Sequence, residues 1–282
     1  SNLSNRNNLN YHLTNNVRTA GVNIKLKNTT FLFRYNDIER LEYLLKNKKI
    51  GIIKMEVERI IKPDIQFLKK LKRLFKKNNI VLIFDECTTG FRQTFGGIYK
   101  IFDVKPDILV LGKALGNGYA ITAVLGKDEI MDKEKETFIS STFWTESIGP
   151  TAALKTLELM ETQKTWVKIT KIGKYVIKNW IKIAKRNSIK IQIKGIPALC
   201  SFEFKSKDNN LYKNLITQEM LKKGFLASNI IYISTSHKKS ILKKYFKILN
   251  DIFKVISKCE KGEDIHIYLN NKVSEKKFSR LN

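Results

Sequence analysis

The stretch IVLIFDECTTGFR, residues 80–92, decides the fold of this chain. Its first five residues form a continuous apolar run, which is typical of a strand buried on both faces of a sheet. Asp85 and Glu86 follow directly, at the point where this strand ends. In open α/β sheets, ligands collect at the carboxyl ends of the strands. A carboxylate at this position is therefore poised to meet a ligand atom.

A second strand with a chemically useful end lies downstream. DILVLG (107–112) is an apolar run that follows the breaker Pro106, and Lys113 comes directly after it. Gly116 and Gly118 follow, and small residues beside a lysine let a flat ligand approach the backbone closely. The glycines do not form the GxGxxG pattern of a dinucleotide fold, so we reject a Rossmann site.

Two more apolar runs, at 50–55 and 120–126, complete the strands predicted for the first half of the chain. Helical stripes separate the earlier strands, with Asn36 as the predicted N-cap of the first helix and Asp64 near the start of the second. Strands that alternate with helices indicate an α/β domain with a mostly parallel sheet.

The pattern changes after a long helical stretch that begins near Gly149 and runs, with a break, to about Asn187. Shorter strands and two helices then indicate a smaller α+β domain. We therefore predict that residues 1–155 belong to a large ligand-binding domain and residues 156–282 to a connecting helix and a small domain. The predicted strands are 189–193, 199–204 and 230–234, and the predicted helices are 211–223 and 238–257.

The chain is strongly basic, with 53 Lys and Arg against 26 Asp and Glu and a net charge of +27. Such a balance raises the question of a nucleic-acid partner. However, the lysines of KKLKRLFKK (69–77) and HKKSILKKYFK (237–247) lie between apolar residues at helical spacing, as on a solvated helix face. No nucleic-acid-binding motif is recognisable. The missing motif therefore argues against a specific nucleic-acid partner, and the same positive charge favours small anionic substrates.

Composition also limits the location and the metal chemistry. Three cysteines without a CxxC pair predict neither a disulfide framework nor a zinc site, and the odd count suits a reducing cytosol. No apolar run approaches the roughly 18 residues of a membrane helix. We therefore expect a cytoplasmic protein with no membrane partner and no metal.

A lysine that faces a carboxylate across a pocket has a clear chemical use. The amine forms a Schiff base with an aldehyde cofactor, and the carboxylate keeps the pyridine nitrogen of pyridoxal phosphate protonated. Strand-end acids and lysines are common in this chain, so the spacing of Asp85 and Lys113 alone leaves this interpretation a hypothesis.

The order of residues adds a resemblance to a family. Four segments, at 52–58, 67–92, 105–126 and 141–158, closely resemble class III pyridoxal-phosphate aminotransferases, and most of all the branch that contains glutamate-1-semialdehyde aminomutase. The resemblance covers roughly residues 20 to 255. It implies a type I aminotransferase fold, a large cofactor domain followed by a small C-terminal domain, and pyridoxal 5'-phosphate as the cofactor.

The resemblance also implies roles for single residues. Asp85 would be the partner of the pyridine nitrogen and Lys113 the Schiff-base lysine. Cys87 replaces the aliphatic residue that packs on the cofactor ring, and Thr88 stands where a contact to the ring hydroxyl is often supplied. Thr142 matches the threonine that reaches the cofactor phosphate of the neighbouring subunit, which implies a homodimer with shared active sites.

Three further assignments concern the substrate and the pocket. Glu56 matches a family glutamate near the substrate and dimer region, although Val57 stands where a proline is usual. Arg92 would either bind an acidic substrate group or stabilise the loop after Asp85, and the sequence does not separate the two. Phe143 and Trp144 would line the pocket or, as is more common for aromatic residues, the core.

The family holds the cofactor phosphate on a loop at a helix N-terminus, where free N–H groups favour an anion. Neither that loop nor the stacking aromatic residue is recognisable in residues 1–50, and the first residue is Ser1 rather than Met. We therefore expect the chain to be the C-terminal two-thirds of a longer enzyme, without its main phosphate anchor and with weak cofactor binding.

Three functions remain open from the sequence. The first is transfer of an amino group from a donor such as glutamate to a carbonyl acceptor, either a sugar or a semialdehyde. The second is an aminomutase, which returns the amine to an adjacent carbon of one substrate. The third is a catalytically silent basic fragment that binds partners or nucleic acid.

Overall fold

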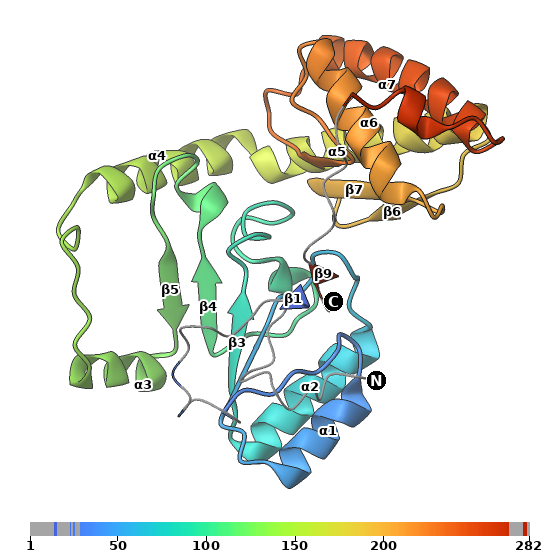
Figure 1. Cartoon of the computed structure of the whole chain (residues 1–282). Helices are drawn as coiled ribbons and strands as arrows, with labels where there is room; N and C mark the ends of the chain where they lie inside the picture. Colours follow the sequence, from blue (N-terminus) through green and yellow to red (C-terminus); the bar gives the residue numbers. More distant parts are fainter. Residues whose placement is uncertain (1–13, 16–22, 24, 26–28, 271–278, 281–282) are drawn as a thin grey trace. The chain divides into compact units, whose positions relative to one another are not determined.

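A computed structural model describes residues 14–15, 23, 25, 29–270 and 279–280 (Figure 1). The opening segment SNLSNRNNLN lies outside the described residues. Contacts divide the chain into two compact units, of which the first takes its residues from 1–53, 63–80 and 275–282 and the second from 54–62 and 81–274. The domain boundary predicted after residue 155 falls within the second unit and stays a prediction.

The first unit contains two helices that lie side by side, α1 (Ile38–Asn47) and α2 (Ile65–Asn78). Helix α2 buries an apolar face and exposes its lysines, as the helical spacing predicts. A short antiparallel pair joins β1 (Thr14–Asn15) to β9 (Ser279–Arg280). The buried residues of α2 are Phe67, Leu68, Leu71 and Phe75.

The caps of these helices follow the predicted residue types with one correction. Asp37, not Asn36, caps α1 by accepting a hydrogen bond from the Arg40 backbone N–H at 3.0 Å. Asn36 has a left-handed backbone (φ 63°), and its Oδ1 accepts a hydrogen bond from the Asp64 backbone N–H at 2.9 Å. Asp64, predicted near the start of the second helix, caps α2, and Asn79 ends that helix in the left-handed region.

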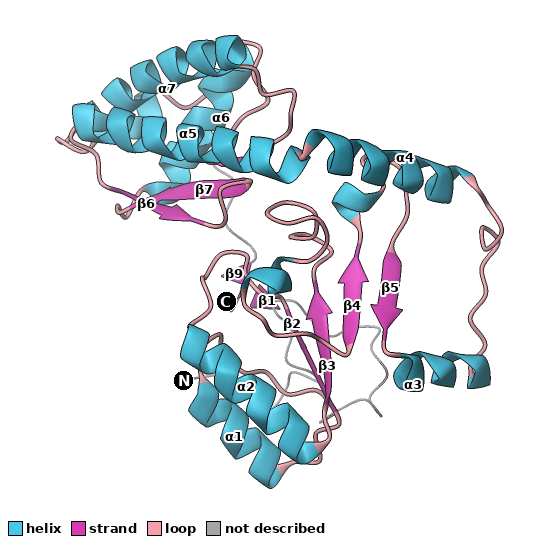
Figure 2. Cartoon of the chain, turned by 180° about the vertical axis from the view of Figure 1, so that it is seen from behind, coloured by secondary structure: helices cyan, strands magenta, loops and turns pink. Residues whose placement is uncertain are grey.

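A four-stranded sheet positions the candidate site. Its strands are β2 (Ile52–Met55), β3 (Val81–Asp85), β4 (Ile108–Leu111) and β5 (Ala123–Gly126), in that order. The four predicted strands are thus confirmed, and Figures 1 and 2 show β3, β4 and β5 side by side.

The direction of the last strand differs from a fully parallel sheet. Strands β3 and β4 are parallel, whereas β4 and β5 are antiparallel. A parallel connection requires a crossover of a dozen or more residues, usually a helix. Between β4 and β5 the chain has only the single 3-10 turn Lys113–Leu115 and a loop, so β5 returns alongside β4 in the opposite direction.

The continuous apolar run predicted that β3 is buried on both faces. This prediction was wrong, because burial alternates along the strand. Leu82 and Phe84 are buried, whereas Val81, Ile83 and Asp85 are half-buried on the other face. The half-covered face is therefore the one that carries the strand-end carboxylate.

One 3-10 helix lies between β3 and β4, and short helices and two long helices follow β5. They are the 3-10 helix η2 (Ile98–Ile101), α3 (Asp128–Met131), the 3-10 helix η4 (Asp132–Glu136), α4 (Ile148–Gln163) and α5 (Thr165–Arg186). The break predicted in the long helical stretch lies at Lys164, whose φ is 48°. No helix among the described residues is both long enough and apolar enough to span a membrane.

The C-terminal part of the second unit has its own sheet and core. Strands β6 (Ile191–Lys194), β7 (Leu199–Phe204) and β8 (Ile230–Tyr232) form an antiparallel sheet in that order. Helix α5 packs over β6 and β7 together with α6 (Asn209–Lys222) and α7 (Lys239–Cys259) (Figure 2). The predicted strands and helices of this region are confirmed. A last 3-10 turn spans Ile265–Ile267.

Candidate active site

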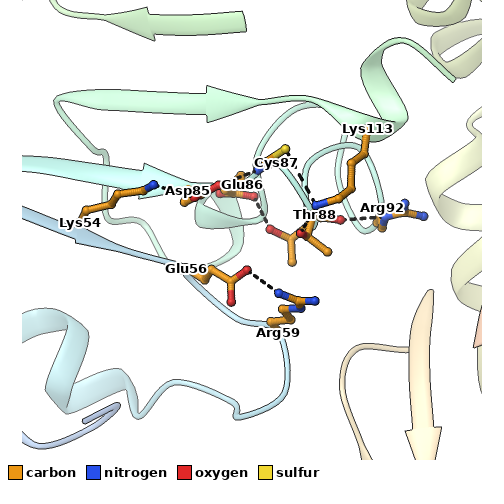
Figure 3. Close-up of polar contacts among 10 residues, drawn as sticks. Lys54, Glu56, Arg59, Asp85, Glu86, Cys87, Thr88, Arg92 and Lys113 are labelled. Atoms are coloured by element: carbon orange, nitrogen blue, oxygen red, sulfur yellow. Dashed lines mark hydrogen bonds and ion pairs between the residues drawn. The ribbon is translucent and has the colours of Figure 1, made fainter. Parts of the chain in front are cut away.

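The carboxylate of Asp85 lies at the C-terminal end of β3, as predicted. Its Oδ1 accepts a hydrogen bond from the Cys87 backbone N–H at 3.2 Å, and its Oδ2 forms an ion pair with Lys54 Nζ at 3.0 Å (Figure 3). Both oxygens of the predicted pyridine partner therefore have donors, and one of these donors is a cation that the sequence did not single out.

The backbone of Lys113 lies just beyond the end of β4, in the 3-10 turn Lys113–Leu115. Its Nζ donates a hydrogen bond to Thr88 Oγ1 at 2.7 Å and lies 3.9 Å from Cys87 Sγ. Lys113 also has a left-handed backbone, with φ 43°, which is uncommon for a residue with a side chain. Strained backbone of this kind occurs preferentially at functional sites.

Residues 87 and 88 connect the acid to the amine. The backbone N–H of Cys87 contacts Asp85, and its thiol lies beside Lys113, whose amine bonds to Thr88. Figure 3 shows Asp85 and Lys113 reaching this turn from opposite sides. Among the described residues no ion pair joins Asp85 directly to Lys113, and the two groups flank the same short turn.

Gly112 permits this close approach of strand β4 to the turn. A Cβ atom on Gly112 would lie 2.8 Å from Cys87 Sγ and 3.2 Å from Thr122 Cγ2. Contacts of 2.8 Å are shorter than carbon and sulfur tolerate, so a side chain here would displace the thiol from its place beside Lys113.

Glu86 has a structural role that differs from that of its neighbour Asp85. It is fully buried, and it accepts hydrogen bonds from the backbone N–H groups of Ile98 and Tyr99 at 2.5 and 2.9 Å and from Thr89 Oγ1 at 3.2 Å. Burial raises the pKa of Glu86, and the N–H donors partly oppose that rise. This carboxylate holds the loop between β3 and η2.

Arg92 is half-buried on the same loop, and its role in binding an acidic substrate group stays a prediction. Its Nε donates to the Thr88 carbonyl at 2.8 Å, which stabilises the loop, and its guanidinium lies 5.6 Å from the ring centre of Tyr232. Burial lowers the pKa of Arg92. Arg92 forms no ion pair with any acid among the described residues, so a substrate carboxylate would meet an uncompensated cation.

The remaining predicted residues lie on other segments of the chain. Glu56 forms an ion pair with Arg59 at 3.0 Å (Figure 3). Thr142, Phe143 and Trp144 belong to the segment before α4 and are exposed, so the two aromatic residues are not part of the core.

Sequence reasoning missed Lys54 and Gly112. The signal for Lys54 was present, because a single lysine interrupts the apolar run of β2 with its neighbours Ile53 and Met55 buried. Alternation along a strand places such a lysine on the less covered face, where Asp85 also lies.

Comparison with known proteins agrees with this geometry. The family profile described as Aminotransferase class-III matches residues 59–251. The chain belongs to the class III aminotransferase family.

Among the curated relatives, 3-aminobutyryl-CoA aminotransferase of Cloacimonas acidaminovorans is 33% identical over 71% of this chain and 50% of its own length. Glutamate-1-semialdehyde 2,1-aminomutase of Nitrosopumilus maritimus is 32% identical over 81% of this chain and 59% of its own length. The chain thus spans between half and three-fifths of the length of these relatives.

Solved structures share the fold. The FumI protein of Sphingopyxis sp. MTA144 superposes with a TM-score of 0.81 at 18% identity, covering 89% of this chain and 64% of that one. Ornithine aminotransferase of Plasmodium yoelii superposes with a TM-score of 0.69 at 25% identity, covering 79% and 62%. The predicted type I aminotransferase fold is confirmed.

Class III aminotransferases use pyridoxal phosphate, and the residues present here fit that group. An aldehyde needs an amine, which Lys113 would supply, and a protonated pyridine nitrogen needs an acceptor, which Asp85 would supply. The thiol of Cys87 and the hydroxyl of Thr88 lie between them. The chemistry of these side chains therefore fits the groups that the cofactor would present to them.

Proposed function

We propose that this chain acts in the pyridoxal-phosphate-dependent transfer of an amino group from an amino donor, such as glutamate, to a carbonyl acceptor. The observation that carries this proposal is the turn at Cys87 and Thr88, because it contacts both the Asp85 carboxylate and the Lys113 amine. The family to which the chain belongs supports the same chemistry.

When bound, pyridoxal phosphate supplies an electron sink for the carbanion that forms at the substrate carbon. Lys113 would attach the cofactor through Nζ and, once the substrate amine has displaced it, would carry a proton to and from that carbon. Thr88 holds the Lys113 amine at 2.7 Å and so sets its direction. Asp85 would accept a hydrogen bond from the pyridine nitrogen and keep that nitrogen protonated.

Substrate recognition would draw on Arg92 and Glu56. The half-buried guanidinium of Arg92 lies over Tyr232 and would bind an acidic group of the donor or acceptor. Glu56 would contact the substrate region through a carboxylate that Arg59 already orients at 3.0 Å. A sugar or a semialdehyde remains the proposed acceptor.

We also propose a homodimer in which Thr142 serves the neighbouring subunit. Large apolar side chains around Thr142 are exposed, with Phe138 at 96%, Phe143 at 75% and Trp144 at 62%. Exposed apolar side chains that cluster in this way often mark a surface that a partner covers. Light scattering that gives the mass of a single chain at assay concentrations would contradict this proposal.

An aminomutase is the second candidate function. It rests on the similarity to proteins named glutamate-1-semialdehyde 2,1-aminomutase, one of which matches 81% of this chain at 32% identity. A mutase needs the same lysine and carboxylate but keeps its intermediate bound. Retention of the intermediate, rather than release of a keto product during turnover, would favour this function.

The test of the proposed function is a titration of the full chain with pyridoxal phosphate, followed by visible absorbance. The wild-type chain is expected to develop the band of a lysine-bound cofactor, and Lys113→Ala is expected to lack it. Lys127→Ala, which removes another exposed lysine of the same unit, serves as the control and should keep the band. A band of equal size in Lys113→Ala would overturn the proposal.

A further inference from the structure

The ion pair between Lys54 and Asp85 has no role in the function described so far. Lys54 lies on β2, where its neighbours Ile53 and Met55 are buried and its own side chain is exposed. Its Nζ approaches Asp85 Oδ2 at 3.0 Å, so a cation already occupies the carboxylate that would receive the pyridine nitrogen (Figure 3).

The two donors on Asp85 hold it in one orientation. The Cys87 N–H binds Oδ1 and the Lys54 ammonium binds Oδ2. An ionised carboxylate offers about four lone-pair sites, so a further donor can still be accommodated.

The Lys54 ammonium would also repel a protonated pyridine nitrogen. A pyridine nitrogen that carries a proton is positively charged, and a like charge close by disfavours it. The Lys54 side chain is 60% exposed and that of Asp85 is 28% exposed. Ion pairs of such exposure contribute little to stability, so the Lys54 ammonium can move away from Asp85 at low cost.

We propose that Lys54 is a positioning residue that holds the Asp85 carboxylate in place before cofactor binds and that competes with the pyridine nitrogen for the same carboxylate. This inference rests on the proposed function, because it assigns Asp85 to the cofactor. Lys54 thereby preorganises the site and at the same time weakens the hold of Asp85 on the cofactor.

The chain contains a matched control pair. Lys127 Nζ lies 2.6 Å from Asp107 Oδ1, with side-chain exposures of 55% and 19% that resemble those of the Lys54–Asp85 pair. Lys127 follows β5 and Asp107 precedes β4, whereas Lys113 follows β4, so this pair lies at the other end of these strands. Lys127→Met removes the same charge as Lys54→Met without touching the site.

The first measurement needs no cofactor. The full chain is treated with limiting acetic anhydride, and mass spectrometry gives the acetylation rates of Lys54 and Lys127. Asp85→Asn is expected to raise the rate at Lys54 by about threefold, the size expected for loss of an exposed ion pair, and to leave Lys127 unchanged. An unchanged rate at Lys54 would show that the lysine does not hold Asp85.

The second measurement is the dissociation constant of pyridoxal phosphate at low salt. Lys54→Met is expected to bind about two- to fivefold more tightly than wild type, with the gain shrinking as salt is added. Lys127→Met should match wild type. If Lys54→Met binds pyridoxal phosphate no more tightly than Lys127→Met does, Lys54 does not compete with the cofactor for Asp85. If no variant binds cofactor, the proposed function fails, and acetylation alone decides whether Lys54 holds Asp85.

Discussion

Asp85 and Glu86 are adjacent carboxylates that differ in burial and in binding partners. Asp85 is half-buried and contacts a cation and a backbone N–H, whereas Glu86 is fully buried and binds only groups of its own loop. Because side chains alternate along an extended chain, consecutive residues point to opposite sides. One acid therefore faces the site and the other faces the protein.

The burial of Glu86 predicts a pH dependence of stability. Its pKa is raised by burial above 4.5, so the folded chain binds this proton more tightly than the unfolded chain does. The free energy of unfolding should therefore fall as pH rises from 4.5 through the folded pKa. Urea denaturation between about pH 4 and about pH 7 would show the stability of wild type, relative to Glu86→Gln, decreasing with pH. A difference that grows with pH would contradict this prediction.

At the scale of elements, the contact between α5 and the turn before β7 depends on a missing side chain. A Cβ on Gly173 would lie 1.9 Å from the carbonyl oxygen of Pro197, which is a backbone atom that cannot rotate away. Helix α5 can therefore approach this turn closely only because residue 173 is glycine.

Gly173→Ala is expected to destabilise the fold by about 1–3 kcal/mol, the cost of overpacking a close contact. The sign is informative, because alanine in place of glycine normally stabilises a helix by about 0.5–1 kcal/mol. Gly51→Ala is the control, since among the described residues nothing beyond its two chain neighbours lies within 4 Å of the place that an added Cβ would take. Thermal or urea unfolding in which both variants match wild type would show that the close contact is absent.

The sequence predicted the strands and helices well where a residue pattern is typical of a single kind of element. Continuous apolar runs located the four strands of the first sheet, and Asp64 marks the start of α2 as predicted. The direction of β5 was not predictable from its composition, because parallel and antiparallel strands have similar apolar runs. The short connection after Lys113 was the feature that indicated the antiparallel direction of β5.

For the site, Asp85 and Lys113 were found because each follows or ends an apolar strand, although their roles stay predictions. The sequence could not show that Asp85 pairs with Lys54, since that pairing depends on which strands are neighbours and which faces they expose. Phe143 and Trp144 were expected in a pocket or core, and their exposure depends on what covers the segment before α4.

At the scale of the whole molecule, the net charge of +27 and the family membership have to be reconciled. The lysines lie largely on exposed helix faces, while the groups assigned to chemistry lie at strand ends. A basic protein attracts anions over its whole surface, and a phosphorylated cofactor and acidic substrates are anions. The charge therefore supports the proposed ligands without requiring nucleic acid.

The central claim is that Lys113 and Asp85 belong to one cofactor site, and borohydride trapping tests it most directly. The full chain is incubated with pyridoxal phosphate, reduced and digested, and mass spectrometry locates the phosphopyridoxyl group. With more than forty lysines in competition, the account predicts predominant labelling of Lys113, lost in Asp85→Asn at the same cofactor concentration. Labelling scattered over exposed lysines, or unaffected by Asp85→Asn, would contradict it.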